Sequence, residues 1–230
     1  MNTKLIISLD FDDLSHAKSL VDQLDPTQCA LKIGSEMFTR FGVDWVRILK
    51  SIGFKIFLDL KFHDIPNTVF AACRAAADLG VWMMNVHASG GLPMMDAARE
   101  ALLPYGSDRP LLIAVTVLTS ISEQNHNAMK LQSSLAQRVM DLAGLAKEAS
   151  LDGVVSAVDE VAQIKSAFGV DFLTITPGIR RASDAPDDQS RVATPEAAVR
   201  AGSDFLVVGR PITRAKNPQI VVEEILQSIK

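Results

Sequence analysis

Cysteine is scarce in this chain. Its 230 residues include only two cysteines, Cys29 and Cys73, and neither lies in a CxxC or His-rich setting. Zinc sites and thiol redox pairs need such clusters, so we expect neither kind of site. Because an amphipathic helix would turn Cys73 inward beside Val69, Ala72 and Ala76, we interpret it as a core residue.

Long apolar runs and an excess of basic charge are also missing. No segment approaches the roughly 20 apolar residues that a membrane span requires, and the apolar run Leu5–Leu9 is too short for a signal peptide. The formal net charge of -4 argues against a nucleic-acid-binding surface, which would need clustered Lys and Arg. We therefore expect a soluble, cytoplasmic protein without a nucleic-acid or membrane partner. An acidic small molecule would have to be bound by a local basic patch.

What the chain does contain is enough apolar material for a sizeable core, since 48% of its residues are hydrophobic. It has no low-complexity tract and no linker. Its length is long for one ordinary domain and short for two, which fits an α/β barrel of roughly 200 to 250 residues that folds as one unit. We therefore predict a single barrel domain over residues 1–230.

Short apolar, β-rich runs recur along the chain, and each is followed by a stretch with helical spacing. The predicted strands are Leu5–Asp10, Cys29–Gly34, Lys55–Phe62, Val81–His87, Leu111–Leu118, Gly153–Ser156, Phe172–Thr176 and Phe205–Gly209. Helix ends are marked as well, by the cap Thr194-Pro195-Glu196 and by Gly53, Gly80 and Gly202.

Strands of nearly continuous hydrophobicity, separated by helices, are typical of a parallel sheet covered on its outer face. Eight such units favour closure into an eight-stranded parallel (β/α)8 TIM barrel, of the α/β class. An open, doubly wound sheet is the alternative fold.

Polar residues stand at the expected strand ends, and in a barrel these ends form the mouth that holds the active site. They are Asp10, Lys32, Asp59, Lys61, Asp64, His87, Thr119, Arg180 and Arg210. Asp59 and Lys61 are two apart on one strand and therefore point to the same side. Lys32, on the adjacent strand, can reach them. Because buried charges need partners, this pattern predicts a charged network; an ion pair that only closes the barrel top is the alternative.

The charges in this cluster indicate its chemistry. Two lysines among the acids would repel a divalent ion, so we expect no metal. A lysine held between carboxylates keeps its charged form and is a proton donor rather than a nucleophile.

A second group of motifs follows the last two predicted strands, as Thr176-Pro177-Gly178-Ile179-Arg180 and Val208-Gly209-Arg210-Pro211. Loops at these positions of a barrel commonly hold a phosphate. Gly209 lets the backbone approach closely, and Arg210 supplies a bidentate charged fork. The polar stretch 180–191 is long for a compact domain, and we interpret it as a lid over the site.

The segment Asp59-Leu60-Lys61-Phe62-His63-Asp64-Ile65-Pro66-Asn67-Thr68 resembles the signature of the bacterial-type orotidine 5'-phosphate decarboxylase family, an Asp-x-Lys-x-x-Asp followed by Ile-Pro-x-Thr. The similarity runs over nearly the whole chain, through Leu9-Asp10, Leu31-Lys32, Thr119-Ser120 and the two phosphate motifs. It implies decarboxylation of orotidine 5'-monophosphate to uridine 5'-monophosphate, the last step of de novo pyrimidine synthesis, without cofactor or metal.

The resemblance also implies catalytic roles. Lys61 would protonate C6 as carbon dioxide departs, with Asp59 against the departing carboxylate. In the family the functional unit is a homodimer, and the residues that match Asp64 and Thr68 reach into the partner's site. The catalytic set is therefore Lys61, Asp59, Asp64 and Lys32.

The remaining matches imply substrate contacts. Asp10 and Lys32 would hold the ribose hydroxyls, and Thr119 or Ser120 would contact the pyrimidine. The phosphate would be held by Arg180, Gln189, the Gly209 amide and Arg210. Pro177 would line the same site.

Two other functions compete with this interpretation. Magnesium-dependent phosphosugar enzymes of the same barrel group, such as ketogulonate-phosphate decarboxylases and hexulose-phosphate synthases, share Asp-x-Lys-x-x-Asp but continue differently from Ile65-Pro66-Asn67-Thr68. A catalytically dead barrel that binds a nucleotide is the second. The roles of two histidines also stay open: His87 lines the pocket or is structural, and His63 is interpreted as structural.

Overall fold

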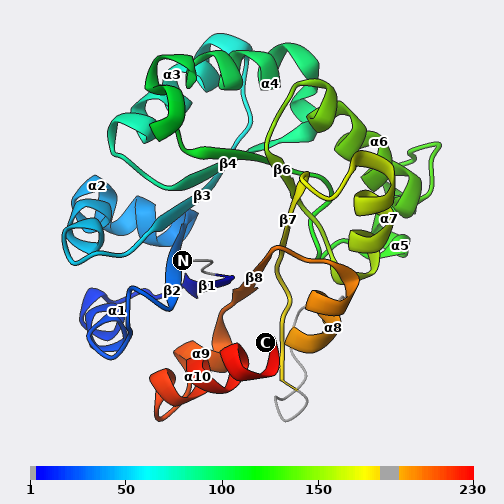
Figure 1. Cartoon of the computed structure of the whole chain (residues 1–230). Coiled ribbons are helices and arrows are strands. Elements are labelled where there is room, and N and C mark those ends of the chain that lie inside the picture. Colours follow the sequence, from blue (N-terminus) through cyan, green and yellow to red (C-terminus); the bar gives the residue numbers. More distant parts are fainter. Residues whose placement is uncertain (1–3, 182–191) are drawn as a thin grey trace.

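In a computed structural model, which describes residues 4–181 and 192–230, the predicted strand segments form one closed, all-parallel barrel in the order β1 to β8 (Figure 1). The strands are β1 Leu5–Leu9, β2 Cys29–Gly34, β3 Ile56–Phe62, β4 Met83–His87, β5 Leu111–Val115, β6 Gly153–Val155, β7 Leu173–Thr176 and β8 Phe205–Val208. The TIM-barrel prediction is thereby confirmed.

Helices surround the barrel and connect consecutive strands (Figure 1). They are α1 Leu14–Val21, α2 Ser35–Ser51, α3 Pro66–Asp78, α4 Gly91–Glu100, α5 Glu123–Ala128, α6 Leu135–Glu148, α7 Val158–Phe168, α8 Pro195–Ala201, α9 Arg210–Thr213 and α10 Pro218–Ser228, with short 3-10 turns at η1 Ala88–Gly90 and η2 Leu103–Asp108. Within the described ranges, no helix is both long and apolar enough to cross a bilayer.

Closure depends on the pairing of the first strand with the last. β1 is hydrogen-bonded to β2 on one side and to β8 on the other, with Leu5 opposite Leu206 and Ile7 opposite Val208. An open sheet would leave two unpaired edges, so the doubly wound alternative is wrong.

The predicted ends of α8 are confirmed. The Thr194 side chain accepts a hydrogen bond from the Ala197 amide at 3.2 Å, and Pro195 occupies the first turn of α8. Gly202 ends that helix in the left-handed conformation, with φ of 98°, which glycine adopts without steric cost.

Several predicted strands extend too far. The fifth ends at Val115 rather than Leu118, and Asp10 and Gly209 lie one residue beyond β1 and β8. At Thr116 the side-chain hydroxyl donates to the Val155 carbonyl at 2.9 Å as the chain leaves the ladder. The apolar run continues past this point because the connection itself lines the mouth, and composition alone does not reveal where the ladder stops.

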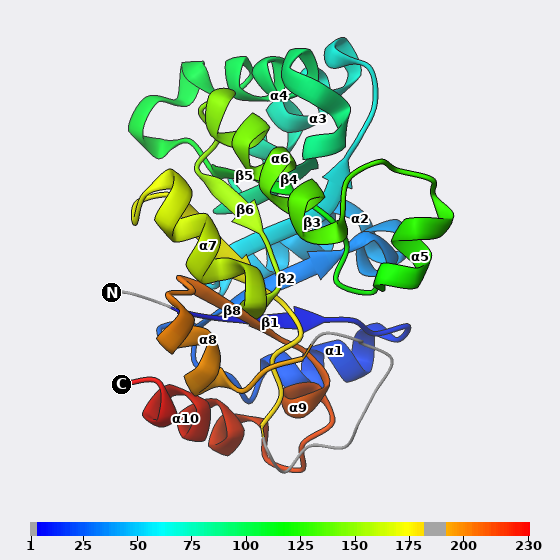
Figure 2. The same ribbon diagram turned by 90° about the vertical axis from the view of Figure 1, so that its right-hand side faces the viewer.

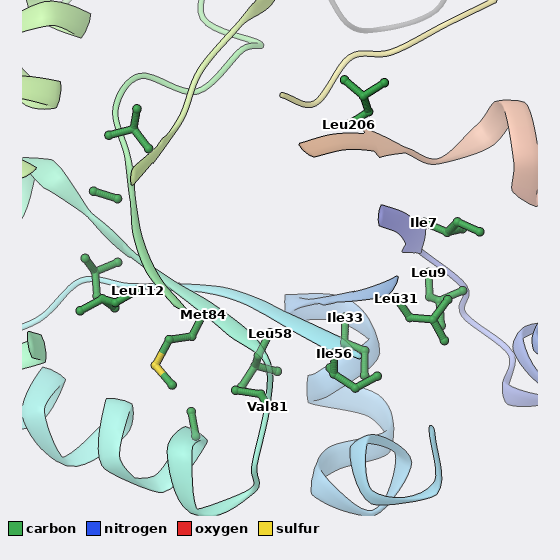
Figure 3. Packing of buried hydrophobic residues seen from close by; sticks show 14 of the residues in the cluster. Ile7, Leu9, Leu31, Ile33, Ile56, Leu58, Val81, Met84, Leu112 and Leu206 are labelled. Carbon is green, nitrogen blue, oxygen red and sulfur yellow. The ribbon is translucent and has the colours of Figure 1, made fainter. Parts of the chain in front are cut away.

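The core has two parts, divided by the strand alternation. Residues that point outward pack against the helices, among them Ile7 of β1, Leu31 of β2 and Leu58 of β3 (Figure 3). Residues that point inward fill the lower barrel, in a cluster of Ile6, Ala30, Phe57, Met83, Ile113, Ile175 and Val207. The barrel is thus closed below by apolar side chains, and only its upper level is available for polar ones.

That upper level lies at the carboxyl ends of the strands. In Figure 2, β1 runs from left to right, so the mouth is on the right, on the side where α5 projects. The side chains of the candidate site are at this end.

Candidate active site

A cavity of about 620 Å³ opens at the barrel mouth. It is of the size that small-molecule sites commonly have. Six strands or the connections that follow them contribute polar groups or backbone to its wall: Ser8, Asp10, Lys32, Asp59, Lys61, Thr119, Pro177, Gly178, Arg180, Gly209, Arg210, Thr213 and Arg214. Apolar side chains, among them Phe57 and Val155, form its floor.

Four side chains of alternating sign form a charged row (Asp10, Lys32, Asp59 and Lys61) along one wall. The Lys32 ammonium lies 3.1 Å from Asp59 Oδ2 and 3.6 Å from Asp10 Oδ1. The Lys61 ammonium donates to Asp59 Oδ1 at 2.7 Å. The predicted network is therefore present, with one acid, Asp59, between two lysines.

Burial differs along this row. The side chains of Lys32 and Asp59 are 12% and 11% exposed, whereas that of Lys61 is 33% exposed and that of Asp10 is 62% exposed. The row is thus exposed to solvent at Asp10, buried at Lys32 and Asp59, and partly exposed at Lys61, which borders the cavity.

Electrostatics hold the central pair in its ionised form. Burial alone would raise the pKa of Asp59, but Lys32, Lys61 and hydrogen bonds outweigh it and keep that pKa below its usual value. For Lys32, burial acts to lower the pKa, and the carboxylates of Asp59 and Asp10 raise it above its usual value. Both groups carry charge at neutral pH.

The backbone of β3 is irregular where Lys61 joins the row. Lys61 has φ of +53°, in the left-handed region that costs a non-glycine residue about 1–2 kcal/mol. The pairing of β3 with β4 shifts register between Leu58 and Phe62. Spacing correctly placed Lys61 beside Asp59, but the regular strand assumed for it is wrong.

Asn85, on β4, is a site residue that the sequence reasoning missed. Its amide donates to Asp59 Oδ1 at 2.7 Å and accepts from the Lys61 backbone N–H at 2.8 Å, and the residue is 0% exposed. A lone polar residue inside the apolar run Met83–Val86, at an inward position, was the available signal.

Ser8 and Gly34 were also missed. Ser8 donates to Asp10 Oδ2 at 2.7 Å and so orients the exposed end of the charged row. A Cβ atom added at Gly34 would lie 3.2 Å from the Lys32 ammonium, so the glycine leaves that ammonium the space it occupies.

The wall formed after β7 and β8 is basic, and it adjoins the charged row where β8 pairs with β1. Arg180 and Arg210 line the cavity from the connections after β7 and β8, beside Gly178 and Gly209. The Arg180 backbone N–H donates to the Ala193 carbonyl at 2.9 Å, which ties together the two described ends of this connection. Arg214, one turn beyond Arg210, is a third cation on this wall that the motif reasoning did not include.

Not every predicted site residue reaches the cavity. Thr119 and Pro177 line it, whereas the exposed Ser120 does not. Asp64 is exposed in the connection from β3 to α3, where its Oδ1 accepts the Ile65 amide at 2.7 Å, and Thr68 is exposed in the first turn of α3. Gln189, and with it most of the predicted lid 180–191, lies outside the described residues.

The two histidines lie against one another behind the charged row. The rings of His63 and His87 have centroids 5.3 Å apart, and neither residue lines the cavity. Burial, His63 and Lys61 lower the pKa of His87 below its usual value, which favours its neutral form. Within residues 4–181 and 192–230, no group of three His, Cys, Asp or Glu side chains is arranged to hold a metal ion.

Comparison with known proteins assigns this architecture to a family. Residues 3–225 match the sequence model of the orotidine 5'-phosphate decarboxylase / HUMPS family. The chain is 58% identical over 229 residues to orotidine 5'-phosphate decarboxylase of Legionella pneumophila strain Paris, with 100% of both chains covered. It is 54% identical over 226 residues to the Vibrio cholerae enzyme of that name, with 98% of each covered.

A solved structure agrees. The crystal structure of orotidine 5'-phosphate decarboxylase from Lactobacillus acidophilus superimposes with a TM-score of 0.88 at 39% identity, covering 99% of both chains. These similarities extend over the barrel and the cavity alike.

Proposed function

Because the chain belongs to the orotidine 5'-phosphate decarboxylase family, we infer that its cavity converts orotidine 5'-monophosphate to uridine 5'-monophosphate, and we propose the residue roles set out below. The protein is a carboxy-lyase of pyrimidine biosynthesis, and its substrate is a small nucleotide. The observation that carries the assignment of residues is the charged row with Lys61 at the cavity's edge.

Lys61 is the general acid of the reaction. When the bond between C6 and the carboxylate breaks, its electron pair stays on C6, and no adjacent carbonyl delocalises this charge. An ammonium fixed beside C6 stabilises the developing carbanion and then transfers a proton to it. Since the Lys61 side chain is 33% exposed, it can regain that proton from water.

Asp59 holds Lys61 in place and lies against the carboxylate that leaves. Its lowered pKa keeps it ionised, so it repels the substrate's carboxylate but not neutral carbon dioxide. Lys32 offsets part of this repulsion, and with Asp10 it contacts the ribose hydroxyls from the more exposed half of the row.

The basic wall binds the phosphate. Arg210 and Arg180 supply charged donors, and the Gly209 amide approaches without a side chain in the way. Thr119 and Pro177 contact the pyrimidine between the two walls. Because the phosphate is remote from C6, its binding energy positions C6 against Lys61 rather than taking part in bond breaking.

We also propose a homodimer with shared active sites. Asp64 and Thr68 are exposed near the mouth instead of lining their own cavity, and Ile65 beside them is 66% exposed. Contact with a second copy would bury this apolar side chain and direct Asp64 and Thr68 to the neighbouring site. We further propose that the whole chain is one catalytic domain and, from its biosynthetic role, that it works in the cytoplasm.

The direct test follows the ultraviolet absorbance of orotidine 5'-monophosphate mixed with purified protein in excess EDTA. Turnover in EDTA is expected, because two lysines in the site disfavour a divalent cation. Strict dependence on magnesium would instead support a phosphosugar-type enzyme. In Lys61→Ala, nucleotide binding is retained and turnover is lost; nucleotide binding without turnover in the unaltered protein as well would identify a sensor.

A further inference from the structure

Asn85 occupies a position where strand geometry would place an apolar residue. It is the third residue of β4, and the inward residue below it, Met83, belongs to the apolar cluster that fills the lower barrel. Asn85 is 0% exposed and does not line the cavity, so it cannot touch the substrate. A buried amide in an apolar strand is costly unless all its polar atoms are hydrogen-bonded.

The register of the neighbouring strand explains what Asn85 does there. Leu58 pairs with Met84, and Phe62 pairs with Val86. Between these pairs β3 advances four positions and β4 advances two, so β3 contains two extra residues. Such a bulge takes backbone groups out of the ladder and re-aims the side chains within it.

Asn85 replaces the missing ladder bond. The Lys61 backbone N–H, turned out of register with φ of +53°, donates to Asn85 Oδ1 at 2.8 Å. Without this acceptor, a strained residue would also have an unpaired amide. The side chain of β4 thus stabilises the backbone conformation that directs Lys61 along the cavity wall.

The other end of the same amide holds Asp59. Its Nδ2 donates to Asp59 Oδ1 at 2.7 Å, the oxygen that also accepts from the Lys61 ammonium. A backbone N–H can only donate and an ionised carboxylate can only accept, so the two contacts fix the orientation of the amide. Asn85 adds a donor without adding a charge, and the alternation of the charged row is kept.

We propose that Asn85 is a positioning residue for the decarboxylation: its one amide sets both the Asp59 carboxylate and the Lys61 backbone, and so fixes the ammonium relative to C6. This inference rests on the proposed function, because it assigns Asn85 to the step that Lys61 performs. It concerns the reacting end of the site only. The basic wall follows β7 and β8, which are not adjacent to β3 or β4 in the barrel.

The first test compares Asn85→Leu, which keeps the shape and removes both hydrogen bonds, with the unaltered enzyme. In this variant kcat should fall about 10- to 100-fold, because the Asp59 carboxylate loses a hydrogen bond and the Lys61 backbone N–H loses its acceptor. KM changes less than about threefold, because the phosphate contacts remain. The matched control is Ser203→Ala, which removes a buried hydrogen bond to Thr176 elsewhere in the barrel and leaves kcat unchanged.

The second test uses Asn85→Asp and also decides the case if Asn85→Leu does not fold. When ionised, the carboxyl group introduced by this substitution still accepts from the Lys61 amide but repels Asp59. When protonated, the same group can donate to Asp59 as the amide does. The ratio of the variant's kcat to that of the unaltered enzyme therefore rises as pH falls from 8 to about 5.

Failure of the proposed decarboxylase function and failure of the proposed role of Asn85 give different results in these experiments. If the unaltered protein does not turn over orotidine 5'-monophosphate, the proposed function fails. If it does, a kcat of Asn85→Leu within about twofold of the unaltered enzyme overturns the role of Asn85. A flat pH ratio for Asn85→Asp also overturns it, because general loss of packing has no such pH dependence.

Discussion

At the scale of single residues, the site depends on Asp59, whose two oxygens bind two different lysines. Lys32 lies 3.1 Å from one and Lys61 2.7 Å from the other. Asn85 donates to the same oxygen as Lys61, so the carboxylate is held by three side chains from three strands. The proposed proton donor, Lys61, is therefore positioned by a carboxylate that is itself fixed by other side chains.

The lowered pKa of Asp59 predicts how stability depends on pH. A carboxyl whose folded pKa lies below its unfolded value of about 4 stabilises the fold above that pH, and this contribution is lost as pH falls through the folded pKa. The free energy of unfolding of the unaltered protein, minus that of Asp59→Asn, should therefore decrease between pH 5 and about 2. Urea unfolding measured across this range is the check, and a difference independent of pH would contradict the assigned ionisation.

The opposite sign applies to Lys32. Its raised pKa stabilises the fold fully below its unfolded pKa of about 10.4, and this contribution is lost as pH rises through the folded value. The pair of Lys32 and Asp59 thus stays charged over the whole neutral range.

Arg210→Ala should weaken substrate binding with little effect on the fold. Loss of a charged donor to phosphate raises KM about 10- to 100-fold, while the melting temperature changes little because Arg210 lines the open cavity. Steady-state kinetics and thermal unfolding measure the two effects. Arg47→Ala, which breaks an exposed pair with Asp44 on α2, is the control. An unaltered KM would refute the phosphate assignment.

Spacing along one strand predicted the pairing of Asp59 with Lys61, because side-chain alternation is a local property. Asn85 and the left-handed backbone of Lys61 were not predicted. Both depend on the register between β3 and β4, which are joined through α3. The hydrophobic periodicity of a single strand does not determine its register with a neighbouring strand.

At the scale of elements, the ends of the strands opposite the mouth are tied by acids of the preceding turns. Asp204, before β8, accepts from the Thr174 amide at 2.7 Å and from the Lys165 ammonium of α7 at 2.6 Å. Asp152, before β6, accepts from the Leu112 amide and pairs with Arg109. Each acid therefore joins a strand to its neighbour and to a cation outside the barrel.

Asp204→Ala should destabilise the fold by about 2–4 kcal/mol, because it leaves the Thr174 amide without its acceptor and the largely buried Lys165 ammonium without its carboxylate partner. Turnover of folded protein should not change, since these contacts lie away from the cavity. Chemical unfolding and kcat are the measurements. Asp44→Ala, at an exposed pair, should cost less than about 0.5 kcal/mol; an equal loss in both variants would contradict the structural role.

All eight strands and the helix caps were predictable because each depends on local signals: apolar runs, turn residues and capping side chains. Strand ends were less predictable, as at β5, where the chain leaves the ladder at Thr116 but the apolar residues Val117 and Leu118 follow. From the sequence, only the number of β/α units favoured a closed barrel over an open sheet. The pairing of β1 with β8 in the structure shows that the barrel is closed.

At the scale of the whole molecule, the proposed catalytic and substrate-binding residues lie in two places. Asp59 and Lys61 border the cavity, whereas Asp64 and Thr68 are exposed outside it. If the proposed dimer forms, each cavity is completed by the second copy, and a monomer is folded but deficient in catalysis.

Mixing Lys61→Ala with Asp64→Ala tests this division. Each variant alone should be nearly inactive, and a mixture that exchanges subunits should regain up to about a quarter of full activity, because half of random dimers are mixed and each has one complete site. Activity after co-refolding, with the dimer verified by sedimentation, is the measurement. If activity stays at the level of the single variants while mixed dimers form, Asp64 acts within its own subunit.

The pairing of β1 with β8 also sets the order in which the enzyme becomes complete during its synthesis. The charged row lies within the first 61 residues, but the strand that closes the barrel and the adjoining Gly209 and Arg210 are translated after the other seven strands. A nascent chain that lacks β8 and the residues after it has two exposed sheet edges, at β1 and β7, and lacks Gly209 and Arg210. Closure of the barrel and completion of the cavity wall by Gly209 and Arg210 therefore depend on the same strand.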